Sequence, residues 1–171
     1  MSGPRVDPLT GLPDRQAMWA RLDSAVRKSG PLAVLFLDLD HFKEVNDRHG
    51  HLAGDQMLVE VARKLEDWRG PADLVARFGG DEFIAILAGA DATAAERRAA
   101  ALLARLRLAE GPGGRCTASL GIATSRANAD AEALLREADL ALYQAKTSGR
   151  DCFRRYLRHC RPEGVRLGWH R

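Results

Sequence analysis

The chain contains 171 residues, of which 46% are hydrophobic and 29% are charged, which is typical of a soluble globular protein with one domain. The longest apolar run, residues 31–37, is far shorter than the about 18 residues that span a bilayer. The net charge of +3 arises at the C-terminal end, where residues 154–171 carry six arginines and one glutamate. The slightly acidic remainder argues against a nucleic-acid partner.

The hydrophobic pattern predicts helices and strands in the order helix, strand, helix, helix, strand, strand, helix, strand, helix, strand. In chain order, the expected ranges are 15–28, 32–39, 41–48, 55–68, 74–77, 83–88, 94–108, 116–124, 131–147 and 151–156. A βαββαβ arrangement within this order favours an α+β fold, a ferredoxin-like or polymerase-palm sandwich. A doubly wound parallel sheet fits less well, because a β-hairpin with glycines at its tip interrupts the alternation.

The three cysteines and the first residues bear on the cellular compartment. An odd number of cysteines without a C-x-x-C pair argues against a disulfide framework and a zinc site. The N-terminus has no apolar stretch of the kind found in secretory signals. We therefore expect a cytoplasmic protein without a transmembrane segment.

Four carboxylates lie at two places that a palm-like sheet can bring together. Asp38 and Asp40 follow a buried apolar strand, and Asp81 and Glu82 lie at the tip of the hairpin. Hard oxygen ligands from two separate elements suit Mg²⁺ and two-metal phosphoryl transfer. The alternative is structural, with Asp40 as the N-cap of the following helix and Asp81 as a turn residue.

Cationic and backbone groups near these carboxylates suit phosphate binding. Phe42 and Lys43 open a helix directly after the strand, where free backbone N–H groups and a lysine can hold phosphates. Lys146 and Arg150 flank the Gly149 helix stop and can reach triphosphate oxygens. Lys146 could instead only complement the dipole of its helix.

Asn46, His51 and Asp55 form a third group. Asparagine and aspartate can recognise the Watson–Crick edge of guanine, because a carboxylate accepts from N1–H and the 2-amino group. The alternative is that Asp55 is a first-turn acid of its helix and that the histidine lies on the surface.

Taken in order, these segments resemble the GGDEF-domain diguanylate cyclases. Residues 79–83 spell the full Gly-Gly-Asp-Glu-Phe motif, and the residues before it read Ala-Arg-Phe. Further segments that match the family in order and spacing are 7–15, 38–47, 119–123 and 138–150. The resemblance extends over about residues 7–155, and Asp14 replaces the asparagine that is usual in the first segment.

The resemblance implies a fold like that of class III nucleotidyl cyclases, with a central, mainly antiparallel five-stranded sheet wrapped by helices. It implies condensation of two GTP into cyclic di-GMP and two pyrophosphates across a two-fold homodimer, as in a bacterial second-messenger enzyme. The chain would then consist of an N-terminal tail (residues 1–6), the GGDEF domain (7–155) and an arginine-rich extension (156–171) that could contact an unknown partner. Because only about six residues come before the first matching segment, we expect the chain to lack the sensor or dimerising module that is usually attached in this family.

By the same resemblance, Asp38, Asp81 and the Leu39 carbonyl would ligate two Mg²⁺ ions, with Mn²⁺ as a possible substitute. Asp81 would deprotonate the 3′-hydroxyl, and Glu82 lies beside it. The groups that would hold the β- and γ-phosphates are the Phe42 backbone, Lys43, Lys146 and Arg150. The groups that would bind guanine or orient the nucleotide are Asn46, Asp55 and His51. Gly79 and Gly80 would let the backbone approach the α-phosphate, where a Cβ would obstruct it.

Two alternatives to an active diguanylate cyclase stay open. One is a regulatory module that binds GTP or cyclic di-GMP without turnover, although Asp38, Asn46, Asp55 and Asp81 are all intact. The other is a different cyclic product, which Asp55 disfavours because it selects guanine.

The inhibitory Arg-x-x-Asp motif of the family is degenerate in this chain. Asp73 lies six residues before Gly79 as expected, but position 70 is glycine, and the nearest arginine, Arg69, is one residue too early. A one-residue shift redirects the planar guanidinium fork. We therefore expect weak or absent inhibition by cyclic di-GMP.

Overall fold

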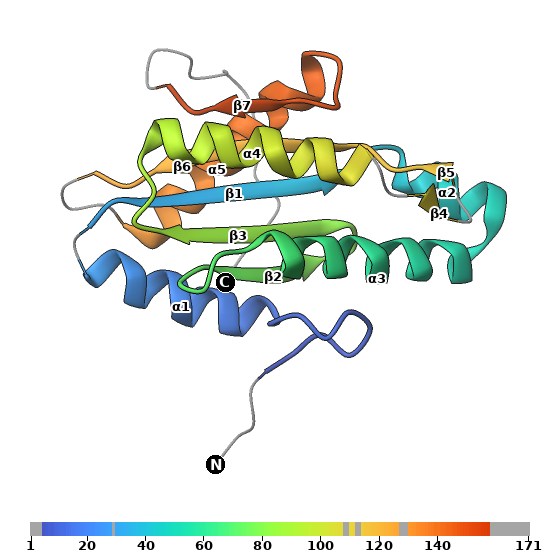
Figure 1. Cartoon of the computed structure of the whole chain (residues 1–171), viewed down its shortest axis with the longest axis horizontal. Coiled ribbons are helices and arrows are strands. Elements are labelled where there is room, and N and C mark those ends of the chain that lie inside the picture. Colours follow the sequence, from blue (N-terminus) through green and yellow to red (C-terminus); the bar gives the residue numbers. More distant parts are fainter. Residues whose placement is uncertain (1–4, 29, 108–109, 112–113, 127–129, 158–171) are drawn as a thin grey trace.

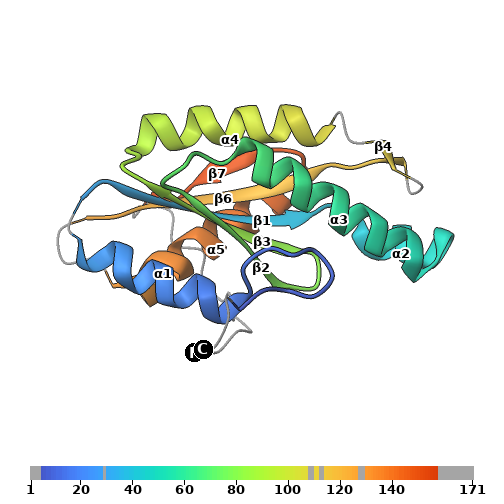
Figure 2. The ribbon, with the colours of Figure 1, turned by 60° about the horizontal axis from the view of Figure 1, so that its bottom comes forward.

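A five-stranded sheet with helices on both faces forms the protein, as the computed structural model shows for residues 5–28, 30–107, 110–111, 114–126 and 130–157 (Figures 1 and 2). The helices are α1 (Arg15–Arg27), α2 (Phe42–His49), α3 (His51–Trp68), α4 (Ala92–Arg107) and α5 (Ala131–Thr147). The sheet strands are β1 (Leu32–Leu39), β2 (Leu74–Gly79), β3 (Glu82–Ala88), β6 (Ala118–Thr124) and β7 (Phe153–Arg155). A separate two-stranded ribbon pairs β4 (Glu110–Gly111) with β5 (Gly114–Arg115).

Strand β1 lies in the middle of the sheet, and all of its residues are buried. Side chains of a strand alternate between its two faces. Leu35 and Leu37 therefore join the core under α3 and α4, and Val34 and Phe36 join the core over α1 and α5. Figure 2 shows these helix pairs on opposite sides of the sheet. Burial on both faces explains why the strand reads as an uninterrupted apolar run.

The strand order is β2-β3-β1-β6-β7, and every neighbouring pair is antiparallel except β6 and β7, which run parallel. This arrangement confirms the expected α+β fold and its mainly antiparallel five-stranded sheet. The register pairs Asp38 at the end of β1 with Glu82 at the start of β3. The hairpin tip therefore lies beside the end of the central strand.

Helix α5 packs directly on β6 at Gly121. A Cβ on Gly121 would lie 1.9 Å from the carbonyl oxygen of Ala138 and 2.2 Å from the backbone nitrogen of Leu142. Only glycine permits this close approach. It brings the last turn of α5, which carries Lys146, to the end of β1 that holds Asp38.

Most element boundaries agree with the expected ones to within two residues, but α3 begins at His51 rather than at residue 55. The break falls at Gly50, whose φ is 84°, and Gly54 lies inside the helix. The ribbon of β4 and β5 was not expected from the sequence. The extension from residue 158 onward falls outside the described residues, and within the part described no helix is long and apolar enough to cross a membrane.

Candidate active site

The carboxylates expected to bind metal come together at the edge of the sheet. Asp38 is the second-to-last residue of β1 and is 8% exposed, and Glu82 is its partner in the β1–β3 pair. Asp81 lies in the turn between β2 and β3, and its carbonyl accepts a hydrogen bond of 3.2 Å from the Leu39 N–H. The backbone thus fixes the hairpin tip to the end of the central strand.

Charge at this edge is only partly balanced. The Lys146 ammonium lies 2.7 Å from a carboxylate oxygen of Asp38. Burial raises the pKa of Asp38 although Lys146 opposes that shift. Burial, followed by the charges of Asp38, Asp139 and Asp81, raises the pKa of Glu82 to about 7. An excess of partly buried negative charge favours binding of a cation at this edge.

The Gly-Gly turn is held by a contact that the sequence motifs do not reveal. Arg77 donates two hydrogen bonds, of 3.0 and 2.8 Å, to the carbonyl of Gly80, whose φ is +47°. The same guanidinium pairs with Asp7 at 3.1 Å, and Asp7 also accepts from Thr10. Burial opposes the shift, but the hydrogen bonds from Thr10 and Arg77 lower the pKa of Asp7 overall. The N-terminal signature is thereby connected to the hairpin tip.

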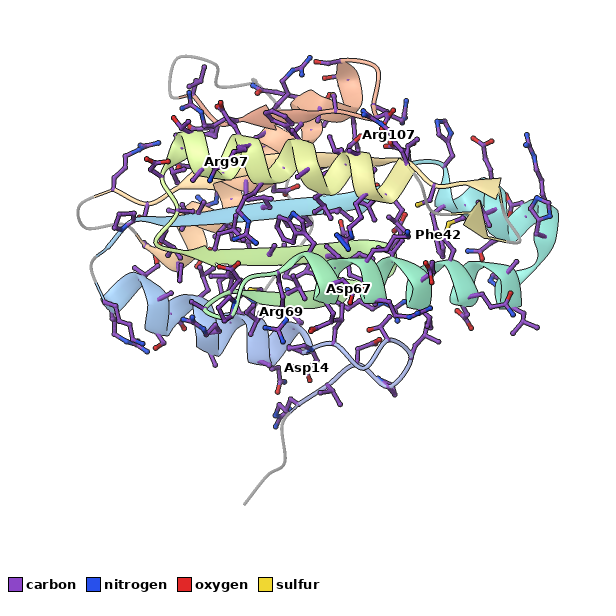
Figure 3. The ribbon with its side chains drawn as sticks, in the orientation of Figure 1. Asp14, Phe42, Asp67, Arg69, Arg97 and Arg107 are labelled. Atoms are coloured by element: carbon purple, nitrogen blue, oxygen red, sulfur yellow. The ribbon has the colours of Figure 1, made fainter. Side chains whose placement is uncertain are left out.

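The beginning of α2 lies beside the carboxylates and offers backbone donors. His41 is the N-cap residue, but its φ of 59° is left-handed and its side chain caps no N–H. Phe42 is the first helical residue (Figure 3). Lys43, which follows it, is exposed. A hydrogen bond from His41 lowers the pKa of Glu44, and the charge of Arg150 adds a smaller contribution in the same direction. Arg150 lies in a turn whose next residue, Asp151, donates its backbone N–H to Asp40, two residues before Phe42.

Asn46 and Asp55 lie on neighbouring helices. The side chain of Asn46 packs against Gly54, where an added Cβ would be 1.9 Å from the Asn46 side-chain oxygen. Asp55 is exposed beside a hollow of about 310 Å³. The residues that line the hollow are Leu9, Leu52, Asp55, Gln56, Val59 and Glu60. His51, the first residue of α3, is exposed.

Asp40 does not cap α2, and its carboxylate is engaged by hydrogen bonds from other segments. Its carboxylate accepts hydrogen bonds from the hydroxyls of Thr117 and Ser119, at 2.9 and 2.7 Å, and from the backbone N–H of Asp151, at 3.0 Å. Both oxygens of the Asp40 carboxylate therefore accept hydrogen bonds from within the protein. The N-cap position of α2 belongs to His41, so the structural alternative in which Asp40 caps this helix is wrong.

The residues of the degenerate inhibitory motif have separate partners. Arg69 pairs with Glu66 at 2.7 Å on the surface of α3 (Figure 3). Asp73 accepts hydrogen bonds from the Gly70 N–H and from Arg98, which also stacks on Trp68. The Asp73 side chain is 4% exposed. Its carboxylate is therefore engaged inside the protein.

Within the part of the chain that the structure describes, no three histidine, cysteine, aspartate or glutamate side chains cluster as a metal cage. Magnesium does not require one, because it keeps several waters and is usually bound by one or two carboxylates together with substrate phosphates. The buried thiol of Cys116, whose pKa burial raises to about 12, is a poor metal ligand.

Comparison with known proteins identifies one family. Residues 5–152 match the family described as "Diguanylate cyclase, GGDEF domain". Diguanylate cyclase DgcP of Pseudomonas aeruginosa is 43% identical over 157 residues, which cover 85% of this chain and 23% of that protein. Cyclic di-GMP phosphodiesterase PdeR of Escherichia coli is 40% identical over 153 residues, covering 86% of this chain and 23% of that protein. The chain thus spans about a quarter of the length of these relatives.

The fold has close counterparts among solved structures. The GGDEF domain of DgcB from Caulobacter crescentus, in complex with c-di-GMP, superposes with a TM-score of 0.85 at 28% sequence identity. The match covers 91% of this chain and 98% of that one. The similarity therefore extends over the whole sheet and its helices.

Proposed function

The chain belongs to the GGDEF family of diguanylate cyclases, and we propose that this domain condenses two GTP into cyclic di-GMP and two pyrophosphates. One observation carries the proposal. Asp38 and Glu82 are paired at one end of the central strands, the Lys146 ammonium lies 2.7 Å from Asp38, and α2, whose N-terminus has no side-chain cap, begins four residues after Asp38. This pairing of carboxylates with phosphate-binding groups suits phosphoryl transfer.

The donor set fits divalent cations. Asp38, Asp81 and the Leu39 carbonyl are hard oxygen ligands at one edge of the sheet. A cationic group, the Lys146 ammonium, already forms an ion pair with Asp38 there. We assign these three groups to two Mg²⁺ ions, for which Mn²⁺ can substitute. Bound there, the metal would activate the attacking oxygen and stabilise the charge of the leaving pyrophosphate.

The protein's own groups would hold the triphosphate. The backbone N–H groups at Phe42 and Lys43, with the side chains of Lys43, Lys146 and Arg150, would bind the β- and γ-phosphates. The Gly79–Gly80 turn leaves room for the α-phosphate, since no side chain projects from it. Binding the phosphates at the end of β1 orients the α-phosphorus toward Asp81 and Glu82.

Base recognition falls to the groups on α2 and α3. Asn46 would contact the guanine edge, and Asp55 would accept from N1–H and the 2-amino group, beside the hollow that Leu9 and Leu52 line. His51 at the start of α3 would help to orient the nucleotide. This arrangement selects guanine over adenine, because adenine offers no matching donors and would leave the acceptor unpaired.

The reaction requires two copies of the domain. One site binds one GTP, so the 3′-hydroxyl of each nucleotide attacks the α-phosphorus of the other across a two-fold axis. Asp81 would take the proton from the 3′-hydroxyl, and Glu82 lies beside it as the first residue of β3. The proposed catalytic domain is residues 7–155, acting in the cytoplasm, and residues 156–171 are an extension to it.

A second candidate is a module that binds the nucleotide without turnover. Cyclic di-GMP phosphodiesterase PdeR matches 86% of this chain, so the domain also occurs in a protein that is named for another activity. Purified protein incubated with GTP and Mg²⁺, followed by mass spectrometry of the nucleotides, separates the two. Cyclic di-GMP formed by the wild type and not by Asp81→Asn supports the cyclase. Intact GTP with measurable GTP binding supports the module and refutes the cyclase.

A further inference from the structure

Asp40 is a buried acid that the proposed site does not use. The residue is 9% exposed and lies one position beyond the end of β1. Its carboxylate accepts hydrogen bonds from the hydroxyls of Thr117 and Ser119, at the start of β6, and from the backbone N–H of Asp151. A buried carboxylate that accepts three hydrogen bonds fixes the positions of the segments that carry the donors. The Asp151 N–H is one of these donors, and it belongs to the turn that follows α5.

That turn has an unusual backbone. Gly149 has a φ of 109°, and the next two residues, Arg150 and Asp151, are also left-handed, with φ of 63° and 48°. Consecutive left-handed residues other than glycine are strained and persist only where surrounding contacts over-determine them. Asp40 supplies one such contact, to the N–H that directly follows Arg150.

A second residue, from α4, also holds the turn. Arg107, at the C-terminal end of α4, donates to both carboxylate oxygens of Asp151, at 2.8 and 2.9 Å, and to its backbone carbonyl, at 2.8 Å (Figure 3). Asp151 is therefore fixed through its N–H by Asp40 and through its carboxylate and carbonyl by Arg107. The planar guanidinium gives this contact a defined direction.

The turn determines where Arg150 points. The residue after it, Asp151, is hydrogen-bonded to Asp40, which lies two positions before the first residue of α2, so the backbone at Arg150 is held close to the start of that helix. The charge of Arg150 also contributes to the lowered pKa of Glu44 in the first turn of α2, which agrees with this placement. Lys146 differs, because it belongs to α5 itself and its place does not depend on the turn. Release of the turn would therefore move Arg150 and leave Lys146 in position.

We propose that Asp40 and Arg107 are positioning residues that hold the turn at Asp151 so that Arg150 meets the terminal phosphates of the nucleotide. The inference rests on the proposed function, since it takes a guanosine triphosphate as the ligand of this site. Neither residue touches the substrate. Their effect passes through the backbone on both sides of Arg150.

The first test compares two variants at position 40. Asp40→Asn can keep all three contacts, because its amide oxygen accepts from Asp151 and Thr117 while its NH₂ group donates to the Ser119 hydroxyl. Asp40→Ala loses them. Calorimetry would measure the binding of guanosine 5′-(β,γ-imido)triphosphate and of GMP with Mg²⁺. We expect Asp40→Ala to weaken triphosphate binding roughly tenfold, as loss of a charge-assisted hydrogen bond implies, and to leave GMP binding unchanged. Asp40→Asn should stay close to the wild type.

The second test does not depend on a buried substitution. Arg107→Ala removes a half-exposed side chain and should weaken triphosphate binding selectively, whereas Arg97→Ala, an exposed arginine of the same helix, should not (Figure 3). In the Arg150→Ala background, Arg107→Ala should add no further loss, because both changes remove the same contact.

Three results overturn the inference: an equal loss of GMP binding, full additivity with Arg150→Ala, or unchanged triphosphate binding in both Asp40→Ala and Arg107→Ala. If Asp40→Ala does not fold, the Arg107→Ala series decides alone. A wild-type protein that binds the triphosphate no better than GMP refutes the phosphate site itself. That failure of the proposed function is distinct from a failure of the positioning role.

Discussion

Substituting Gly54 by alanine should weaken guanine binding without destabilising the fold. The added Cβ would lie 1.9 Å from the side-chain oxygen of Asn46 and 3.1 Å from the ring of Phe42. Contacts of this kind are normally at least 3.0 Å, so the Asn46 oxygen must move by about 1 Å. Because Asn46 is a flexible side chain, it can move at little cost to stability, but it then no longer meets the base.

The two effects have opposite signs and can be measured separately. Loss of one neutral hydrogen bond costs about 0.5–1.5 kcal/mol, which corresponds to roughly 2- to 12-fold in affinity. Replacing glycine by alanine inside a helix adds up to about 1 kcal/mol of stability, which offsets the cost of moving Asn46 and the Phe42 ring. Thermal melting and calorimetry with a GTP analogue would give both values. Asn46→Ala should reproduce the loss of affinity, and Gly30→Ala, where an added methyl meets nothing within 4 Å, should show none. Unchanged affinity in Gly54→Ala would refute the role of Asn46.

Asp81→Asn should reduce turnover by at least about a hundredfold in steady-state assays while the melting temperature is retained, and more than about a tenth of the wild-type rate would contradict its assignment. Asp55→Ala should weaken GTP binding and reduce the preference in binding affinity for GTP over ATP. Equal binding of both nucleotides by the wild type would be inconsistent with guanine selection. Because Asp73 is paired with Arg98, cyclic di-GMP should not inhibit the protein at micromolar concentrations. Inhibition that disappears in Asp73→Ala would disprove this. Removing the partner of the buried Asp73 by Arg98→Ala should lower the free energy of unfolding by about 3 kcal/mol in denaturant titrations. Since the pKa of Asp7 is lowered in the folded protein, its stabilising effect is present above its ordinary value of 3.8 and is lost as the pH falls through the folded pKa. Asp7→Asn should therefore destabilise the protein at pH 7 and progressively less in acid, and a loss of stability that is the same at every pH would count against the ion pair.

Much of the fold could be predicted because the pattern and the packing agree. The apolar run of β1 indicated burial on both faces, and the glycines between β2 and β3 indicated a hairpin. The start of α3 was missed because Gly54 reads locally as a helix break. The structure gives it another role, as the small residue against which Asn46 packs.

The sequence predicted the site residues that belong to motifs, but not the residues whose role depends on contacts between distant parts of the chain. The positions of Asp38 and Asp81 follow from the strand and the hairpin. The partners of Asp40 lie more than seventy residues away in the chain, and Arg107 meets Asp151 across forty-four residues, so no local pattern reveals either contact. The pairing of Asp73 with Arg98 is likewise visible only once α4 is packed against the sheet.

The most direct measurement of the central claim is the stoichiometry of the reaction. Wild-type protein incubated with GTP and Mg²⁺ would be sampled over time for GTP, pyrophosphate and cyclic di-GMP. Two GTP joined across a two-fold dimer should give two pyrophosphates and one cyclic di-GMP for every two GTP consumed, with a specific activity that rises with protein concentration. No pyrophosphate release, or release with a different nucleotide product, would contradict the proposed diguanylate cyclase.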